Sequence, residues 1–204
     1  MHASVMKRRI AIEPGSAPPR ERILAVARDL FYREGIHAVG VDAIAEAAGT
    51  NKMTLYRHFA SKDALIAACL EQLVAEFEAA WDGTAAACAD DPLAQLKSWM
   101  RHVAEFKMSQ ADRGCAFVNA AAELPDKEHP ARRIIEQYKT RHREKLIALC
   151  EKAGLTEPDL LADKMFLLCE GARVSIQCMG ANGPASRLPK LLEDLINDHA
   201  RRKH

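Results

Sequence analysis

Apolar residues recur at helical spacing along most of the chain, and no stretch alternates apolar and polar residues as a half-buried strand would. Gly, Pro and Asp residues interrupt this pattern and divide it into segments of helical length. The pattern therefore predicts an all-α protein. The nine expected helices span about 20–34, 41–48, 52–59, 62–81, 92–109, 115–123, 129–153, 158–179 and 185–201.

The first three expected helices are close enough in sequence to enclose one small core. Helix 20–34 places Ile23, Ala27, Leu30 and Phe31 on one face, and Gly35 follows as its stop. A head of fewer than about 50 residues buries little apolar surface by itself. We therefore expect the first three helices to pack against the long helix that begins after the capping residue Ser61.

The second and third helices form a helix-turn-helix. In helix 41–48 the inward positions are Val41, Ile44, Ala45 and Ala48. Gly49 supplies the left-handed stop, and Asn51 caps the next helix after a tight turn. In that next helix Leu55 and Phe59 share the inward face. Its outward positions are Lys52, Thr54, Tyr56, Arg57 and His58. A short helix with a basic, hydroxylated and aromatic face suits DNA, which a recognition helix reads in the major groove.

The segment GVDAIAEAAGTNKMTLYRHFASKDAL resembles the DNA-binding domain of TetR/AcrR family transcriptional regulators. It carries the family's Ile-Ala, Ala-Gly, Thr-Leu-Tyr, Phe and Ser-Lys positions, and the resemblance covers residues 20–66. The sequence departs from the family at Gly40, where Ser or Thr is usual, and at Thr50, where Val is usual. The resemblance implies a helix-turn-helix domain at 20–66 and an effector-binding, dimerising helical domain at 67–204.

The resemblance also implies roles for individual residues. Lys52 and Met53 would contact bases, the lysine at guanine and the methionine at a thymine methyl group. Phosphate contacts would come from Thr54, Tyr56, His58 and Lys62. Asp42 either accepts a hydrogen bond from cytosine N4 or only favours its helix dipole. Arg57 either binds phosphate or pairs with an acid of the chain.

Charge is distributed unevenly along the chain. Residues 1–62 hold ten Lys and Arg against six Asp and Glu, and residues 63–204 hold nineteen against twenty-two. A positive head and a mildly negative body indicate one DNA-facing end. Residues 1–19, with Lys7-Arg8-Arg9 and several prolines, are expected to be a disordered basic arm, which either follows the DNA backbone or is a solvated tail.

The last two helices are expected to form a homodimer interface, as the family implies. Helices 158–179 and 185–201 are more apolar than one core requires, and Gly171-Ala172 would allow close approach of a partner helix. The predicted interface residues are Leu160, Leu161, Met165, Leu168, Ala172, Ile176, Met179, Leu188, Leu191, Leu192, Leu195 and Ile196. The alternative is that these residues form only an intramolecular core.

An effector would bind among the body helices, where polar groups interrupt apolar faces. Cys115, Asn119 and Glu123 form such a polar line at i, i+4 and i+8 of helix 115–123. The other predicted effector contacts are Trp99, His102, Phe106, Phe117, Tyr138, Cys169 and Arg173. Arg173 would favour an anionic or carbonyl ligand. The alternative is an internal network in which Glu123 pairs with Arg132, Arg133 or Arg173.

Neither a metal site nor a cofactor is expected, because the six cysteines and eight histidines show no metal-ligand spacing. Cys115 follows Gly114 at a helix start, so a thiol-based redox sensor is an alternative to ligand control. No Gly-rich phosphate loop or nucleophile motif supports an enzyme. A third alternative is an architectural DNA-binding protein without an effector.

The expected function is a ligand-responsive transcriptional regulator. It would bind a palindromic DNA operator as a homodimer and be released by a small-molecule effector, with repression as the family's default. No apolar run approaches the roughly 18 residues that span a membrane, and no signal peptide is evident, so a cytoplasmic location is expected.

Overall fold

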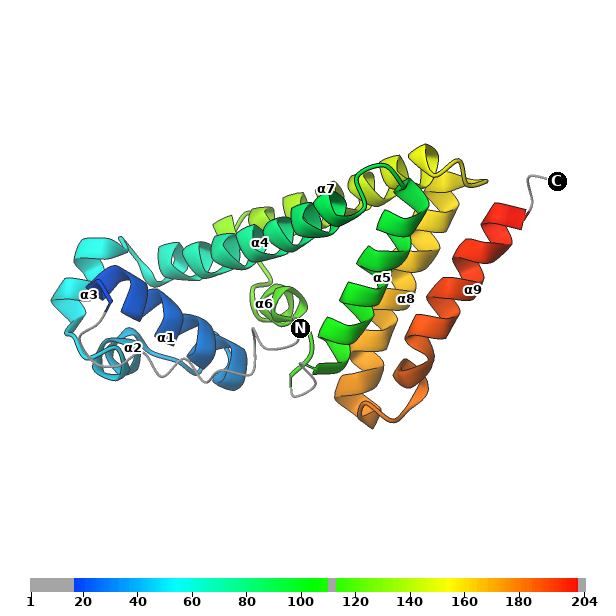
Figure 1. Cartoon of the computed structure of the whole chain (residues 1–204). Coiled ribbons are helices and arrows are strands. Elements are labelled where there is room, and N and C mark those ends of the chain that lie inside the picture. The colour runs from blue at the N-terminus through cyan, green and yellow to red at the C-terminus, as the bar shows by residue number, and fades with distance from the viewer. Residues whose placement is uncertain (1–16, 110–112, 202–204) are drawn as a thin grey trace. The chain divides into compact units, whose positions relative to one another are not determined.

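The computed structural model describes residues 17–109 and 113–201, with side chains left out at 106–109 and 201 (Figure 1). Most of the predicted basic arm, including Lys7, Arg8 and Arg9, lies outside these residues. Within them the chain is all-α, as predicted, and has no strand. The elements are α1 (Pro19–Glu34), α2 (Val41–Ala47), α3 (Lys52–His58), α4 (Lys62–Ala87), α5 (Pro92–Ser109), α6 (Ala116–Glu123), α7 (Pro130–Lys152), α8 (Pro158–Met179), the 3-10 helix η1 (Pro184–Arg187) and α9 (Leu188–Arg201).

Two predicted helix boundaries are wrong. Helix α4 continues to Ala87 instead of ending near 81. Gly83 lies within it, and the Thr84 hydroxyl donates to the Ala80 carbonyl at 2.9 Å. The last predicted helix is divided into η1 and α9, since Pro184 starts a single tight turn before Leu188. No described helix is long and apolar enough to cross a membrane.

The described chain forms two compact units. The first unit comprises residues up to Gln72 together with Ala120–Ile134, so it contains α1 to α3, the beginning of α4 and the α6–α7 corner. The sequence instead predicts that residues 120–134 belong with the rest of 67–204 to the effector-binding helical domain. The core of the unit is apolar and includes Ile23, Ala27, Phe31, Ile44, Ala45, Leu55, Leu65, Ile66 and Cys69.

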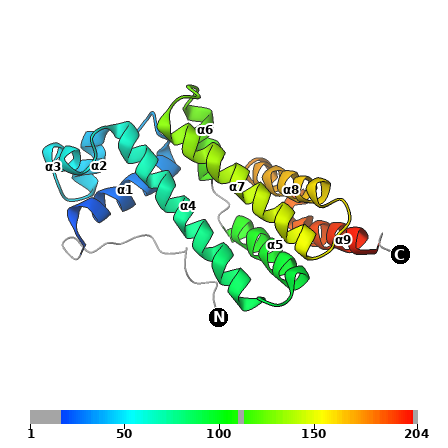
Figure 2. The same cartoon turned by 90° about the horizontal axis from the view of Figure 1, so that it is seen from above.

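The second unit comprises Leu73–Asn119 and the residues from Ile135 onward. Within it α5, α8 and α9 lie side by side, as both views show (Figures 1 and 2). The continuous core draws on these helices and on α7, and its largest fully buried side chains include Trp99, Leu146, Leu161, Met165, Leu192 and Ile196. This core fixes the helices from which a body pocket is built.

Candidate functional site

The turn between α2 and α3 is held by backbone geometry and by one side chain from α1. Gly49 has φ +63°, and the next residue, Thr50, donates its N–H to the Ala45 carbonyl at 2.9 Å. Arg22 donates from Nε to the Ala48 carbonyl at 3.1 Å and from Nη2 to the Gly49 carbonyl at 3.4 Å. A guanidinium that satisfies carbonyls left open at a helix end fixes the angle at which the next helix leaves.

Helix α3 begins at the cap that the sequence predicts. The Asn51 side chain accepts the Thr54 N–H at 2.9 Å. Leu55 and Phe59 are buried, as expected from their i, i+4 spacing, whereas Met53 is 69% and Tyr56 43% exposed. Lys52, Arg57 and His58 are also exposed, and Thr54 is half-buried. The structure therefore gathers the predicted base-reading and phosphate-binding side chains of α3 on a surface that the other described residues leave largely exposed.

Asp42 and Lys52 form an ion pair that the sequence did not predict. The Lys52 Nζ lies 3.0 Å from Asp42 Oδ2, and the two side chains are 53% and 74% exposed. The hydrogen bond and charge of Asp42 raise the pKa of Lys52 above its ordinary value. Two residues that sequence reasoning treated as separate DNA contacts are thus joined across the turn.

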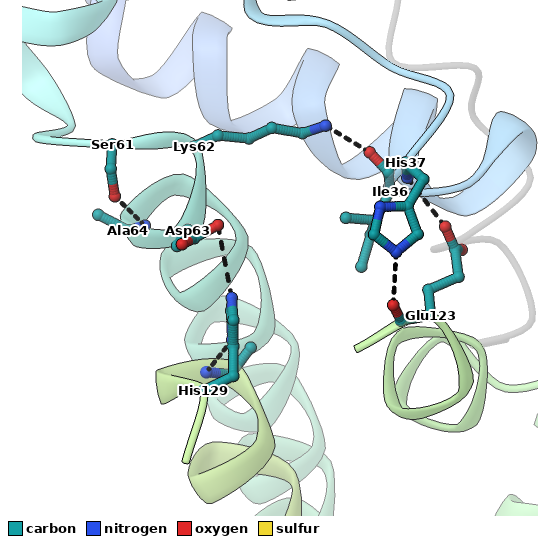
Figure 3. Close-up of polar contacts among 9 residues, drawn as sticks. Ile36, His37, Ser61, Lys62, Asp63, Ala64, Glu123 and His129 are labelled. Atoms are coloured by element: carbon teal, nitrogen blue, oxygen red, sulfur yellow. Dashed lines mark hydrogen bonds and ion pairs between the residues drawn. The ribbon is translucent and has the colours of Figure 1, made fainter. Parts of the chain in front are cut away.

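Lys62, the predicted phosphate contact at the start of α4, makes two contacts within the chain. Its ammonium donates to the Ile36 carbonyl at 2.6 Å (Figure 3) and lies 5.9 Å from the centre of the Phe31 ring. The lysine therefore ties the start of α4 to the α1–α2 loop. In this conformation the Lys62 ammonium makes contacts that stabilise the first unit.

Glu123 also differs from its expected role as an effector contact. His37 donates its backbone N–H to Glu123 Oε2 at 2.9 Å and its ring Nε2–H to the Glu123 carbonyl at 2.6 Å (Figure 3). Gly35 has φ +98°, and a Cβ there would lie 3.1 Å from the carboxylate. The predicted arginine partners are engaged elsewhere, Arg132 at the Ala121 carbonyl and Arg133 at Glu128. Glu123 thus fastens the end of α6 within the first unit.

A second contact holds the beginning of α7 in the same unit. His129 accepts the Ala131 N–H on Nδ1 at 3.1 Å, and its Nε2 lies 3.4 Å from Asp63 Oδ1 (Figure 3). Because Nδ1 accepts, the proton is on Nε2 and is directed at the carboxylate. The first turn of α4 is therefore bonded to the α1–α2 loop through Lys62 and to α7 through Asp63.

A pocket lies within the second unit, between α4, α5, α7 and α8. It is lined by Phe77, Trp99, Met100, Val103, Tyr138, Lys139, His142, Leu146, Met165, Phe166, Cys169, Glu170 and Arg173. The predicted effector residues Trp99, Tyr138, Cys169 and Arg173 are among them. The spacing of Tyr138 with His142, and of Phe166 with Glu170, would have identified further lining residues from the sequence.

Other predicted effector residues lie behind or away from this pocket. His102 stacks on Trp99 with ring centres 5.5 Å apart, and Phe117 stacks on Tyr138 at 4.7 Å. Cys115 Sγ accepts a hydrogen bond from Arg173. Asn119 donates to the Arg113 carbonyl at 2.6 Å, near the start of α6. The Phe106 side chain lies outside the described residues. The predicted polar line of α6 therefore does not face one ligand.

The pocket carries more positive than negative charge. Lys139 pairs with Glu170 at 2.8 Å, while Arg173 Nη1 lies 3.7 Å from the same carboxylate and is only 15% exposed. These three are the lining residues with a full charge at neutral pH, so one positive charge is left in excess. The Trp99 indole N–H is buried and has no hydrogen-bond partner among the described residues. Burial raises the pKa of the Tyr138 phenol, which therefore stays a neutral hydroxyl.

Comparisons with known proteins agree with this arrangement. The family model for bacterial regulatory proteins of the tetR family matches residues 23–69. The transcriptional regulator UidR of Escherichia coli (strain K12) is 44% identical over 55 residues, which cover 27% of this chain and only 28% of UidR. A TetR-family transcriptional regulator from Streptomyces coelicolor has a TM-score of 0.83 at 29% identity, covering 89% of this chain and 96% of that chain. A TetR transcriptional regulator from Streptomyces avermitilis has a TM-score of 0.71 at 30% identity, covering 89% and 99%.

A capped helix-turn-helix with an exposed basic second helix, followed by an all-helical body, defines a DNA-binding regulatory protein. This arrangement, together with the solved structure that is 30% identical and covers 89% of this chain, shows the family to which the chain belongs. The chain belongs to the TetR family of bacterial transcriptional regulators, and the resemblance and fold class predicted from the sequence are confirmed.

Proposed function

We propose that this regulator is a homodimeric, ligand-responsive repressor that binds a palindromic operator. The exposed face of α3 carries this proposal, because Lys52, Met53, Tyr56, Arg57 and His58 are accessible on a helix held rigidly by its cap and by Arg22. The N-terminal residues of such a helix reach base edges while the flanking groups hold phosphates.

The homodimer is supported by an apolar stripe on α8. Leu160, Leu167, Gly171, Val174 and Cys178 recur at spacings of three, four and seven and are all exposed. A Cβ at Gly171 would meet nothing within 4 Å, so a partner helix has room to approach. A four-helix contact between two subunits would bury this stripe.

Most residues first assigned to that interface belong to the core of the chain itself. Seven are buried within the second unit, namely Leu161, Met165, Ala172, Ile176, Leu188, Leu192 and Ile196. Leu168 and Leu195 are partly buried against the same core. Only Leu160, Met179 and Leu191 of the predicted set are exposed. The interface proposed here therefore uses the opposite side of α8.

The effector we propose is a small planar anion that binds at the pocket of the second unit. The cavity measures only about 30 Å³, so its walls must move apart to admit a ring. Aromatic rings of Phe77, Trp99, Tyr138 and Phe166 supply flat apolar walls. The excess charge of Arg173 would receive a carboxylate, since a buried cation needs a counter-charge. The buried indole N–H of Trp99, which has no hydrogen-bond partner among the described residues, is a candidate further donor.

Selection of genomic fragments by the purified protein, followed by gel shift on the enriched sequence, tests the DNA-binding function. Enrichment of a palindrome supports it, and the Tyr56→Ala variant should retain its helical fold while losing retention of that DNA. A folded wild-type protein that enriches no sequence would contradict the proposal. Release of the complex by a pocket ligand, rather than tighter binding, distinguishes a repressor of this type from a regulator that requires its ligand.

Thermal unfolding with a panel of aromatic carboxylates tests the effector. Carboxylates should raise the midpoint temperature, their uncharged methyl esters should do so less, and Arg173→Met should remove the difference. Equal shifts from acid and ester would contradict the role assigned to Arg173.

A thiol sensor is the second candidate, favoured by the hydrogen bond that Arg173 donates to Cys115. Under mild oxidant, DNA binding by the wild type would then fall while that of Cys115→Ser would not. A response that persists in Cys115→Ser but disappears in Cys178→Ser would instead assign oxidation to Cys178, which is exposed in the single chain but lies in the proposed subunit contact.

A further inference from the structure

The ion pair between Asp42 and Lys52 places a donor and an acceptor side by side on the surface proposed to meet DNA. Asp42 comes from α2 and Lys52 from the first position of α3, and both side chains are more than half exposed. Their charged atoms are 3.0 Å apart. The inference below rests on the proposed DNA-binding function and concerns what this pair reads.

The major-groove edge of every base pair presents a matching arrangement. In a G·C pair the guanine O6 accepts a hydrogen bond from the cytosine N4 amino group, and in a T·A pair the thymine O4 accepts one from the adenine N6 amino group. A keto oxygen and an amino nitrogen therefore lie about 2.9 Å apart, and both remain able to bond into the groove. This spacing matches the separation of the Lys52 ammonium and the Asp42 carboxylate.

We propose that Asp42 and Lys52 act as one clamp that reads the orientation of a single base pair. Lys52 donates to the keto oxygen while Asp42 accepts from the amino group of the paired base. In the reversed orientation the amino group would face the ammonium and the keto oxygen would face the carboxylate, so both contacts become repulsive. The clamp thus distinguishes G or T from C or A on the strand that faces Lys52.

Between the two accepted pairs, G·C is preferred over T·A. Guanine presents N7 beside O6, so the lysine can donate to two acceptors. Thymine carries its C5-methyl group on that side, where it would press on the ammonium. The expected order is G·C, then T·A, then the two reversed pairs.

The carboxylate explains why the clamp serves specificity and not affinity. An acid on a DNA-facing surface is repelled by phosphates, and its pairing leaves the two side chains without net charge. At a reversed base pair the carboxylate keeps Lys52 but faces a keto oxygen in place of an amino group, and a desolvated acceptor that faces another acceptor is costly. Lysine alone would read guanine but would lack this penalty for a reversed pair.

The test is site selection from a randomised duplex library with the full-length wild-type chain, followed by affinity measurement on the selected half-site. All four base pairs are placed in turn at each position, symmetrically in both half-sites. We expect one position at which reversal of the preferred G·C pair weakens binding by about 10-fold or more, since one good side-chain–base contact is worth roughly 1–3 kcal/mol.

Asp42→Ala is the informative variant and Glu46→Ala its matched control. Glu46 is an exposed acid one turn further along α2, so its removal changes the same charge on the same helix. Both variants should bind sites with a reversed pair more tightly, because each removes a negative charge, and Asp42→Ala should gain least at the preferred pair, where it also loses its contact with the amino group. Only Asp42→Ala should flatten the preference at the clamped position, and N4-methylcytosine there should weaken the wild type but not Asp42→Ala.

Two results would overturn the clamp, and they are distinguishable. If the wild type selects a site but Asp42→Ala and Glu46→Ala change all positions alike, the clamp is wrong while the DNA-binding function stands. If the wild type selects no site although it is folded and dimeric, the DNA-binding function fails and the clamp with it.

Discussion

Arg22 and Arg57 are arginines with different roles. Arg22 stabilises the first unit through hydrogen bonds, whereas Arg57 is exposed and is proposed to bind DNA. Arg22 donates to the carbonyls of Ala17, Ala48 and Gly49, whereas Arg57 is exposed on α3. Arg22→Ala should lower the free energy of unfolding by about 1–3 kcal/mol, because several carbonyls lose a charged donor. Arg57→Ala should change it by less than about 0.5 kcal/mol, as is usual at exposed sites.

Urea unfolding and gel shift on the selected operator together check this pair of variants. Arg57→Ala should weaken DNA binding without loss of stability, since its role is proposed to be a phosphate contact. A large loss of stability in Arg57→Ala would indicate that it pairs with an acid of the chain.

A buried thiol, Cys69, gives the first unit a defined response to alkaline pH. Burial raises the pKa of Cys69 from 9.0 to about 12. The folded state therefore keeps its proton while the unfolded state loses it above pH 9. The stability from this group is complete below pH 9 and is lost progressively between pH 9 and 12.

Denaturant midpoints measured from pH 8 to pH 10.5 test this dependence. The midpoint should fall more steeply with pH in the wild type than in Cys69→Ala, because the variant lacks the titrating thiol. Parallel curves would show that Cys69 does not couple pH to folding.

For single residues of α3, the helical period alone predicted which side chains face inward and which face outward. Leu55 and Phe59 are buried and Met53 and Tyr56 exposed because one helix repeats every 3.6 residues. The Asp42–Lys52 pair could not be predicted in this way. Its members lie on different helices, and their distance depends on the angle that Gly49 and Arg22 impose.

Helix α6 shows why element boundaries and environments are harder to predict than element types. The sequence predicts a helix at 115–123, and the structure has it at Ala116–Glu123. The sequence also predicts that Cys115, Asn119 and Glu123 face one ligand. The helix instead begins in the second unit and ends in the first. Sequence periodicity describes a helix face and does not reveal that its two ends meet different surroundings.

The contact between Glu123 and His37 leads to a prediction for the α6–α7 corner. Glu123→Ala should lower the free energy of unfolding by about 1 kcal/mol, because the His37 N–H loses its carboxylate acceptor. Glu128→Ala removes an exposed acid from the same loop and should cost much less, since its pair with Arg133 is solvated.

Urea unfolding of both variants, monitored by circular dichroism, provides the measurement. Glu123→Gln should recover part of the loss, since its amide oxygen can still accept the His37 N–H. If Glu123→Ala and Glu128→Ala are equally stable, the contact seen at the corner contributes nothing to the first unit.

Helix α8 is a longer element for which the sequence pattern likewise did not reveal what each helix face contacts. It is apolar on two faces, and the sequence could not tell which one the chain itself buries. The contribution of α5 and α9 to the core selects Leu161, Met165 and Ile176, and this leaves Leu160, Leu167 and Val174 exposed. Only the folded arrangement separates an internal face from one available to a partner.

The exposed stripe of α8 carries the last prediction, which concerns the whole molecule. Leu167 is 68% exposed, so Leu167→Glu should leave the fold of the chain intact while placing a carboxylate at the proposed subunit contact. A buried charge without a partner is strongly unfavourable, and two copies would face each other across an isologous interface. Val118→Glu, at a 43% exposed apolar residue on α6, is the matched control.

Light scattering should find Leu167→Glu monomeric and Val118→Glu dimeric at the same concentration. The monomer should lose about 100-fold or more in affinity for a palindromic operator, because two linked heads gain affinity from each other. Its affinity for a single half-site should be unchanged, since α3 is untouched. A dimeric Leu167→Glu would place the interface elsewhere. A monomer that still binds the palindrome as tightly as wild type would show that operator recognition does not depend on this contact.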